Sequence, residues 1–205
     1  MLDRVASTSI SPDMLNAERA AKLCTIGPSA DGFSFAATKL FASSQGLVGG
    51  LDALASLQHL THVEIGSNRL TTLSGLEHLP NLASLVAAEN RLEVLLDFPA
   101  PSPNGSRLRR ADLSRNRIAT LAPHLDAAGR ACGIEAHTHL EMLQLNENAI
   151  QSLGRFAALH SLHTLSLSRN EVQDQEGATI GGMFPAGLTC LDLSHNRHLS
   201  AVPPS

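Results

Sequence analysis

An asparagine recurs in this 205-residue sequence inside one apolar frame, and that recurrence restricts the possible fold more than any other property of the chain. The clearest copies of the frame begin at Leu60, Leu140 and Leu162 and read L-x-x-(L/V)-x-(L/I)-x-x-N-x-(L/I/V). A frame that returns every 22 to 32 residues predicts stacked copies of one unit, because each unit is too short to bury its apolar face alone. The recurring asparagines are Asn68, Asn90, Asn116, Asn148, Asn170 and Asn196.

The frame resembles that of leucine-rich repeat proteins, and its shortest copies resemble the short intracellular, phosphatase-regulator-like subclass. The resemblance implies an α/β solenoid, with a curved ladder of parallel strands inside and 3-10 turns and loops outside. Leucines three residues apart on the return leg, such as Leu73, Leu76 and Leu79, fit 3-10 turns better than long helices. A solenoid of this kind offers a binding surface, but the repeat pattern does not identify the ligand.

Alternate strand positions are predicted to build the interior, because successive side chains of a strand point to opposite faces. Val63 and Ile65 are the inward pair of the first clear copy. The six asparagines are predicted to point inward as well and to bond backbone groups of the turn that leaves each strand, so we assign them a structural role. The equivalent inward pairs are Leu85 and Ala87, Ala111 and Leu113, Leu143 and Leu145, Leu165 and Leu167, and Leu191 and Leu193.

Three regions are expected along the chain. Residues 1–10 are expected to be disordered, and residues 11–35 to form an N-terminal helical cap that covers the open edge of the solenoid. Residues 36–205 are expected to form the solenoid, with one degenerate repeat, six further repeats and no clear C-terminal cap. In the degenerate repeat Gly46 stands where the asparagine belongs.

Local signals predict a cap helix and three insertions. Ser11 is the expected N-cap of a helix over 12–24, because Pro12 follows it at the first helical position. The segments 99–106 and 173–187 are rich in glycine or proline and are predicted to be loops. The insertion over 123–139 is predicted to contain a short helix from about Leu125 to Cys132.

Composition excludes several classes of partner. The formal net charge of −4 argues against a general binder of nucleic acid or of anionic membranes. Aromatic residues make up 3% of the chain, with no Trp or Tyr, so platforms for stacking bases are scarce. Three scattered cysteines favour a reducing compartment, and neither a secretory signal nor an apolar run of ~20 residues is recognisable. We therefore expect a soluble cytoplasmic protein.

The candidate binding surface is the concave face, formed by the outward strand positions and the residues that follow each strand. These positions carry mixed charge, with Val86 and Met142 as apolar exceptions, which favours a protein partner over a small-molecule substrate. An ordinary solvated face is the alternative for any single residue. The candidates are His62, Glu64, Val86, Glu89, Arg110, Asp112, Arg115, Met142, Gln144, Asn146, Glu147, Thr164, Arg169, Asp192 and His195.

Arginines directly follow four of the six asparagines and are predicted to line one rim of the solenoid. Such a stripe either serves solubility and local turn contacts or binds an acidic partner. The arginines are Arg69, Arg91, Arg117 and Arg197.

Neither a metal centre nor a catalytic site is indicated. Close histidine pairs begin at His59, His137, His160 and His195, but no cysteine or carboxylate completes a tetrahedral set at ligand spacing. No nucleophile with a neighbouring base and no phosphate-binding glycine loop is recognisable. We expect a non-catalytic protein without a cofactor.

The N-terminal part of the chain resembles a more specific family over roughly residues 11–92. The shared elements are a Ser-Pro-Asp-Met helix start at Ser11, a Leu-Cys pair at Leu23 before a turn, and a Lys-Leu pair at Lys39. They resemble the axonemal radial-spoke family of leucine-rich repeat-containing protein 23. The resemblance implies a structural subunit that docks other radial-spoke proteins in cilia or flagella. A soluble regulatory adaptor, of a phosphatase-targeting or dynein-chain-like type, is the alternative.

Overall fold

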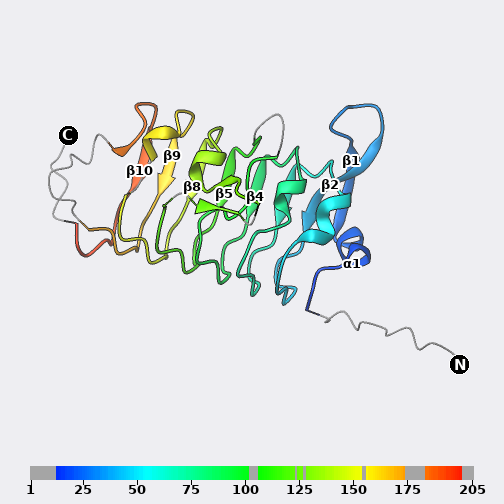
Figure 1. Ribbon diagram of the computed structural model, residues 1–205, viewed down its shortest axis with the longest axis horizontal. Helices are drawn as coiled ribbons and strands as arrows, with labels where there is room; N and C mark the ends of the chain where they lie inside the picture. The colour runs from blue at the N-terminus through cyan, green and yellow to red at the C-terminus, as the bar shows by residue number, and fades with distance from the viewer. Residues whose placement is uncertain are drawn as a thin grey trace, which may run out of the picture.

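The computed structural model describes residues 13–101, 106–122, 124–126, 128–153, 156–173 and 183–199. Its main feature is an eight-stranded sheet in the order β1-β2-β3-β4-β5-β8-β9-β10, whose strands lie side by side along the long axis of the molecule (Figure 1). The predicted parallel-strand solenoid is confirmed. The strands are β1 (Cys24–Pro28), β2 (Phe35–Phe41), β3 (His62–Glu64), β4 (Ser84–Val86), β5 (Arg110–Asp112), β6 (His124–Leu125), β7 (Ala131–Cys132), β8 (Met142–Gln144), β9 (Thr164–Ser166) and β10 (Cys190–Asp192).

From β2 to β10 the large sheet is parallel, and each repeat pairs with the next without a shift of register. The middle residue of each central strand is buried, as at Val63, Leu85 and Leu143. Burial of these stacked side chains fixes the register, because a slip by one residue would turn them to solvent. Leu191 in β10 is an exception to the predicted interior: 39% of its surface is exposed. Within the described residues no further strand covers β10 on its outer side.

The asparagines form the predicted internal ladder. The amide nitrogen of Asn90 donates to the carbonyl of Ile65 in the preceding repeat (3.0 Å) and to that of Ala87 in its own repeat (3.1 Å). Its amide oxygen accepts the backbone N–H of Leu70 (3.0 Å). These are backbone groups that neither sheet nor helix would satisfy, so each asparagine completes the turn of the repeat before it. Equivalent bonds are made by Asn68, Asn116, Asn148, Asn170 and Asn196.

The return legs are short 3-10 helices and loops, as the leucine spacing predicts. Their leucines lie in the core, and Gly75 permits close stacking of neighbouring legs. Gly75 has a φ of 105°, and a Cβ atom at this position would lie 2.6 Å from the backbone nitrogen of Asp52. The 3-10 helices are η1 (Asp52–Ser56), η2 (Leu76–His78), η3 (Ile134–Ala136) and η4 (Phe156–Ala158).

The N-terminal cap differs from its prediction. Helix α1 spans only Ala17–Lys22, and its N-cap is Asn16, whose side chain accepts the backbone N–H of Arg19 (2.8 Å). The predicted N-cap Ser11 lies outside the described residues. The rest of the cap is an antiparallel hairpin of β1 and β2, which covers the edge of the parallel sheet next to α1 (Figure 1). Pairing with β2 satisfies backbone groups that a longer helix would have left exposed at that edge.

The degenerate first repeat keeps the geometry of the others without its own asparagine. Leu40 of β2 pairs with Val63 of β3 in the parallel register. Gly46 takes a φ of 68°, and the amide oxygen of Asn68 accepts the N–H groups of Gln45 (2.9 Å) and Leu47 (3.0 Å) on either side of it. Asn68 therefore stabilises this turn from the following repeat.

The helix predicted from Leu125 to Cys132 is wrong, because this insertion forms a small antiparallel hairpin of β6 and β7. Its turn is held by Asp126, whose Oδ1 accepts the N–H groups of Ala128 (3.0 Å) and Arg130 (2.7 Å). Gly129 adopts a φ of 77°, which interrupts a helix. The predicted loop tips at 102–105 and 174–182 lie outside the described residues.

A buried histidine connects the two insertions that flank β5. The His137 ring packs against Phe98 with ring centroids 4.6 Å apart, and its Nδ1 and Nε2 lie within hydrogen-bond distance of Ser106 and Phe98. Desolvation lowers the pKa of His137 to about 4, so the ring is neutral at pH 7. His137 therefore has a packing role and is not open to a ligand.

Candidate protein-interaction surface

Two columns of side chains cross the concave face, the face of the sheet that points away from the core. In β3, β4, β5, β8 and β9 the first and third residues point outward, while the second is buried. In register, the first column contains His62, Arg110, Met142 and Thr164, together with Ser84 and Cys190. The second column contains Glu64, Val86, Asp112, Gln144 and Asp192, together with Ser166. The structure thus brings the candidates of both columns onto one surface.

A third column comes from the residue that precedes each ladder asparagine. Each of these residues has a positive φ, between 53° and 59°, although none is glycine. L-residues adopt this left-handed conformation rarely, and here the asparagine bonds on either side of the turn hold it. The repeated backbone geometry sets the side chains in a row beside the strand ends. The row is Ser67, Glu89, Arg115, Glu147, Arg169 and His195.

Opposite charges alternate along this third column and form an ion-pair chain. Arg115 lies 2.7 Å from Glu89 and 3.3 Å from Glu147, and Arg169 lies 3.4 Å from Glu147. The hydroxyl of Ser67 donates to Glu89 (2.7 Å), and this bond, followed by that from Arg115, holds the pKa of Glu89 below its usual range. The hydrogen bond to Glu89, followed by the charge of Glu147, raises the pKa of Arg115. All four charged groups remain partly exposed, so each pair contributes little to stability and mainly orders the side chains.

Asn146 stands beside the ion-pair chain and orders the next repeat. Its Oδ1 accepts the hydroxyl of Ser166 (2.6 Å) and the backbone N–H of Ser168 (2.9 Å). Two repeats later, Oδ1 of Asp192 accepts the N–H of Ser194 within its own turn (2.9 Å), and this bond lowers the pKa of Asp192. Both side chains are thus held by the scaffold at the ends of their strands.

A small hollow lies in the middle of the concave face. Its volume is about 170 Å³, and its lining includes Val86 and Met142 beside Arg110, Asp112 and Gln144. Arg110 is exposed and has no ion pair with any residue that the structure describes. The hollow combines an apolar floor with a free cation and a carboxylate.

An exposed apolar cluster on the N-terminal hairpin was missed by the sequence analysis. The exposed fractions of Ile26, Phe33 and Phe35 are 76%, 93% and 80%. Phe41 follows on β2 at 43% exposure, with its ring 5.7 Å from that of His62. Three of the six phenylalanines in the chain are therefore exposed on this hairpin. The clustering of half the aromatic residues in one segment, over 33–41, was the signal available in the sequence.

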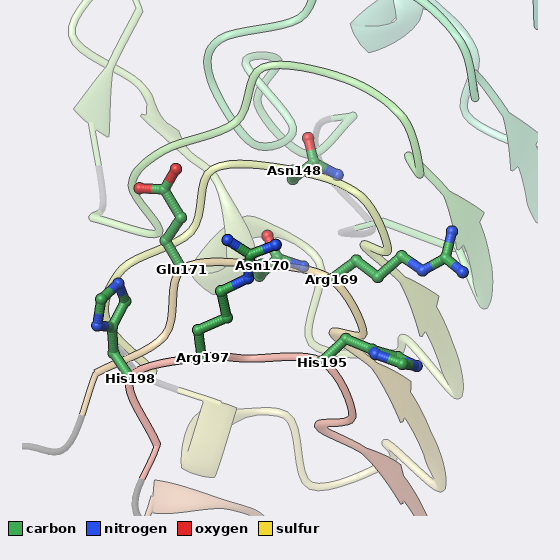
Figure 2. A pocket seen from close by; sticks show the side chains of 7 residues that line it. All are labelled: Asn148, Arg169, Asn170, Glu171, His195, Arg197 and His198. Atoms are coloured by element: carbon green, nitrogen blue, oxygen red, sulfur yellow. The ribbon is translucent and has the colours of Figure 1, made fainter.

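A larger hollow of about 510 Å³ lies beside the last described repeats (Figure 2). It is lined by Asn148, Arg169, Asn170, Glu171, His195, Arg197 and His198. Only Arg197 of the predicted arginine stripe takes part, because Ala149 and Glu171 occupy the same frame position in the two preceding repeats. The stripe is therefore interrupted between Arg117 and Arg197.

The histidine pairs do not form metal centres in the described part of the chain. No group of three His, Cys, Asp or Glu side chains there could hold a metal ion. His59 accepts the backbone N–H of Ala30 (3.3 Å), while His62 lies beside Phe41. Over the same residues, no helix has the length and apolar character needed to cross a membrane.

Comparison with known proteins agrees with this architecture. The family model described as "Leucine Rich repeat" matches residues 158–177. An internalin (inlF) from Listeria monocytogenes str. 4b F2365 is similar in structure, with a TM-score of 0.63 and 24% identity over 82% of this chain and 44% of that chain. The structure of a TLR13-ssRNA13 complex is similar with a TM-score of 0.56 and 22% identity, over 77% of this chain and 23% of that one. No curated protein matches the sequence significantly.

The chain therefore has the leucine-rich repeat fold, as its repeat frame, its solenoid and these similarities agree. It spans less than half the length of either solved relative. At such identities the similarity shows the fold alone. Solenoids of this class typically serve as interaction domains.

Proposed function

We propose that this protein is a non-catalytic scaffold that binds another protein on its concave face. The observation that carries the proposal is the central hollow, where the apolar side chains of Val86 and Met142 lie next to Arg110 and Asp112. An apolar anchor site surrounded by charged groups is typical of the centre of a protein interface. A volume of about 170 Å³ suits one side chain of a partner better than a whole small-molecule substrate.

The charges around the hollow indicate the chemistry of the partner. Arg110 is unpaired among the described residues, whereas Arg115 and Arg169 already share Glu89 and Glu147. A partner that inserts an apolar side chain and offers a carboxylate toward Arg110 would gain both contacts without breaking the ion-pair chain.

The resemblance of residues 11–92 to the radial-spoke family supports a narrower proposal, in which the partner is another axonemal subunit of a cilium or flagellum. The short repeats support the alternative of a soluble cytoplasmic adaptor of the phosphatase-targeting type. Detergent extraction of ciliated cells distinguishes the two. An axonemal subunit stays with the demembranated axonemes, while recovery in the soluble fraction would favour the adaptor.

The concave face can be tested with two variants in the neighbouring repeats of β5 and β8. Arg110→Glu combined with Met142→Glu is expected to abolish partner capture, because it removes the cation and the apolar floor. Arg117→Glu repeats the charge change of Arg110→Glu at the rim, outside the hollow, and is expected to leave capture unchanged. Capture is measured by affinity purification of the tagged protein followed by mass spectrometry, and folding by thermal melting. Equal capture by the double variant and the wild type would overturn the proposal.

A further inference from the structure

The hollow beside the last described repeats is lined by arginine and histidine side chains. Figure 2 shows Arg197 reaching across its middle toward Asn170, with Arg169 and His195 extending on one side and His198 standing on the other. These residues come from the turns that follow β9 and β10, so the ladder of asparagines fixes their backbones. Two arginines and two histidines thus border one volume of about 510 Å³.

Carboxylates near the hollow neutralise the charge of its arginines only in part. Glu171 accepts the side-chain amide of Gln151 (3.2 Å), and its carboxylate points away from Arg197 (Figure 2). Glu147 is shared between Arg115 and Arg169. Asp192, near His195, accepts hydrogen bonds from Ser194 and Ser166. Arg197 makes no ion pair and no side-chain hydrogen bond with any described residue, so its guanidinium donors are open to a ligand.

The floor of the hollow does not compete for a ligand. The amide oxygen of Asn170 already accepts the N–H of Ile150, and its nitrogen donates to backbone carbonyls such as that of Leu145 (2.8 Å). Asn148 is engaged in the same manner, with Ile118 as donor to its oxygen. Recognition therefore falls to the arginine and histidine side chains, and the guanidinium donors of Arg197 favour an anion.

We propose that this hollow binds a phosphate-type dianion, with Arg197 as its main ligand and with Arg169, His195 and His198 at its border. A guanidinium presents two parallel N–H donors that match the oxygens of a phosphoryl group. The hollow is larger than one phosphate ion requires, so it also has room for a molecule that carries the phosphoryl group, such as a phosphorylated side chain. The site is separate from the central concave hollow and does not depend on the function proposed for that surface.

The test is a titration followed by amide NMR chemical shifts, at constant ionic strength, with two probes. One probe is inorganic phosphate and the other is the peptide acetyl-Gly-phosphoserine-Gly-amide, with its unphosphorylated form as the control. Saturable shifts are expected around Arg197 and Asn170 for a phosphorylated probe. If both probes saturate the shifts, the hollow accepts a phosphorylated side chain as its ligand. If only phosphate saturates them, the ligand is the free ion.

The variant Arg197→Gln is expected to weaken binding at least about tenfold, because it removes a charge-assisted, bidentate contact. Arg197→Lys keeps the charge without the fork and is expected to give an intermediate loss. Arg117→Gln is the matched control, since Arg117 holds the same frame position outside the hollow. The spectrum of each variant away from the hollow checks the fold. The proposal would be overturned if neither phosphate nor the phosphoserine peptide caused saturable shifts. It would also be overturned if the unphosphorylated peptide bound equally well, or if Arg117→Gln weakened binding as much as Arg197→Gln.

Discussion

The imidazole Nδ1 of His137 lies 2.7 Å from the hydroxyl oxygen of Ser106, although 31 residues separate the two in sequence. The second ring nitrogen, Nε2, lies 3.1 Å from the carbonyl oxygen of Phe98 and must donate to it. Nδ1 of the neutral ring then accepts the hydroxyl hydrogen of Ser106. Protonation would replace this acceptor with a donor inside an apolar site, so burial and geometry both favour the neutral form.

The first prediction is a pH dependence of stability. The pKa of His137 is about 4 in the folded protein, below the ~6.5 of an unfolded histidine, so between these values only the unfolded chain binds the proton. Stability contributed by the neutral ring is therefore complete above pH 6.5 and is lost as the pH falls toward 4. From pH 7 to pH 5 the loss should be about 2 kcal/mol. Urea denaturation at both values measures it, and His137→Gln should reduce the difference; an equal difference in the variant would contradict the assignment.

The second prediction concerns the asparagine ladder. Asn90→Ala leaves the N–H of Leu70 and the carbonyls of Ile65 and Ala87 without their side-chain partner, at a cost of about 1–3 kcal/mol. Asn81→Ala is the control: its amide bonds the carbonyl of Gln58 in an exposed contact and should cost less than about 0.5 kcal/mol. Chemical denaturation of both variants measures the difference. Equal losses would mean that the ladder bonds do not stabilise the turns.

The third prediction compares two leucines at the same frame position. Leu143 is fully buried, and truncation to alanine should cost roughly 2–5 kcal/mol because a cavity remains. Leu191 is 39% exposed, so the same truncation should cost about 1 kcal/mol or less. Denaturant titrations of both variants measure the two losses in the free energy of unfolding. A cost for Leu191→Ala as large as that for Leu143→Ala would show that β10 is covered in solution.

The fourth prediction separates two glycines with positive φ. Gly75→Ala should destabilise by about 3 kcal/mol, since it adds steric overlap with the Leu51–Asp52 backbone to the strain of a left-handed alanine. Gly129→Ala bears the strain alone, because no atom lies within 4 Å of the added Cβ, and should cost about 1 kcal/mol. Thermal melting of the pair provides the comparison. Similar melting temperatures would contradict the close approach at Gly75.

The repeat frame predicted the sheet, its register and the asparagine bonds because these depend on a period shared by all repeats. The predictions that were wrong concern segments that lie outside the repeat frame. Cys24 was predicted to end a helix, but it opens the hairpin strand that covers the sheet edge, and such a tertiary need overrides local helix signals. The segment after Leu125 was predicted to be helical, although Asp126 and Gly129 together are a turn signal that the sequence did contain.

The candidate surface was predictable to a similar extent. Alternation along the strands placed Arg110, Asp112 and Met142 on one face, because side-chain direction follows from strand geometry alone. The pairing of Arg115 with Glu89 and Glu147 depends on side-chain rotamers and on three turns stacked in space. The hollow at Arg197 likewise requires side chains of different lengths in successive repeats, which no single copy of the frame reveals.

The asparagine ladder has a direction. Each amide oxygen accepts an N–H from the repeat before it, as Asn196 does from Val172, so a repeat is completed only by its successor. Removing repeats from the C-terminal side leaves the backbone N–H of the last turn without the asparagine oxygen that accepted it. Removing repeats from the N-terminal side leaves a ladder asparagine without the carbonyl of the preceding repeat to which its amide nitrogen donated. Unzipping of this solenoid is therefore asymmetric: a turn is left open each time its successor is lost, and any chain grafted after it must bring an asparagine in register to close it.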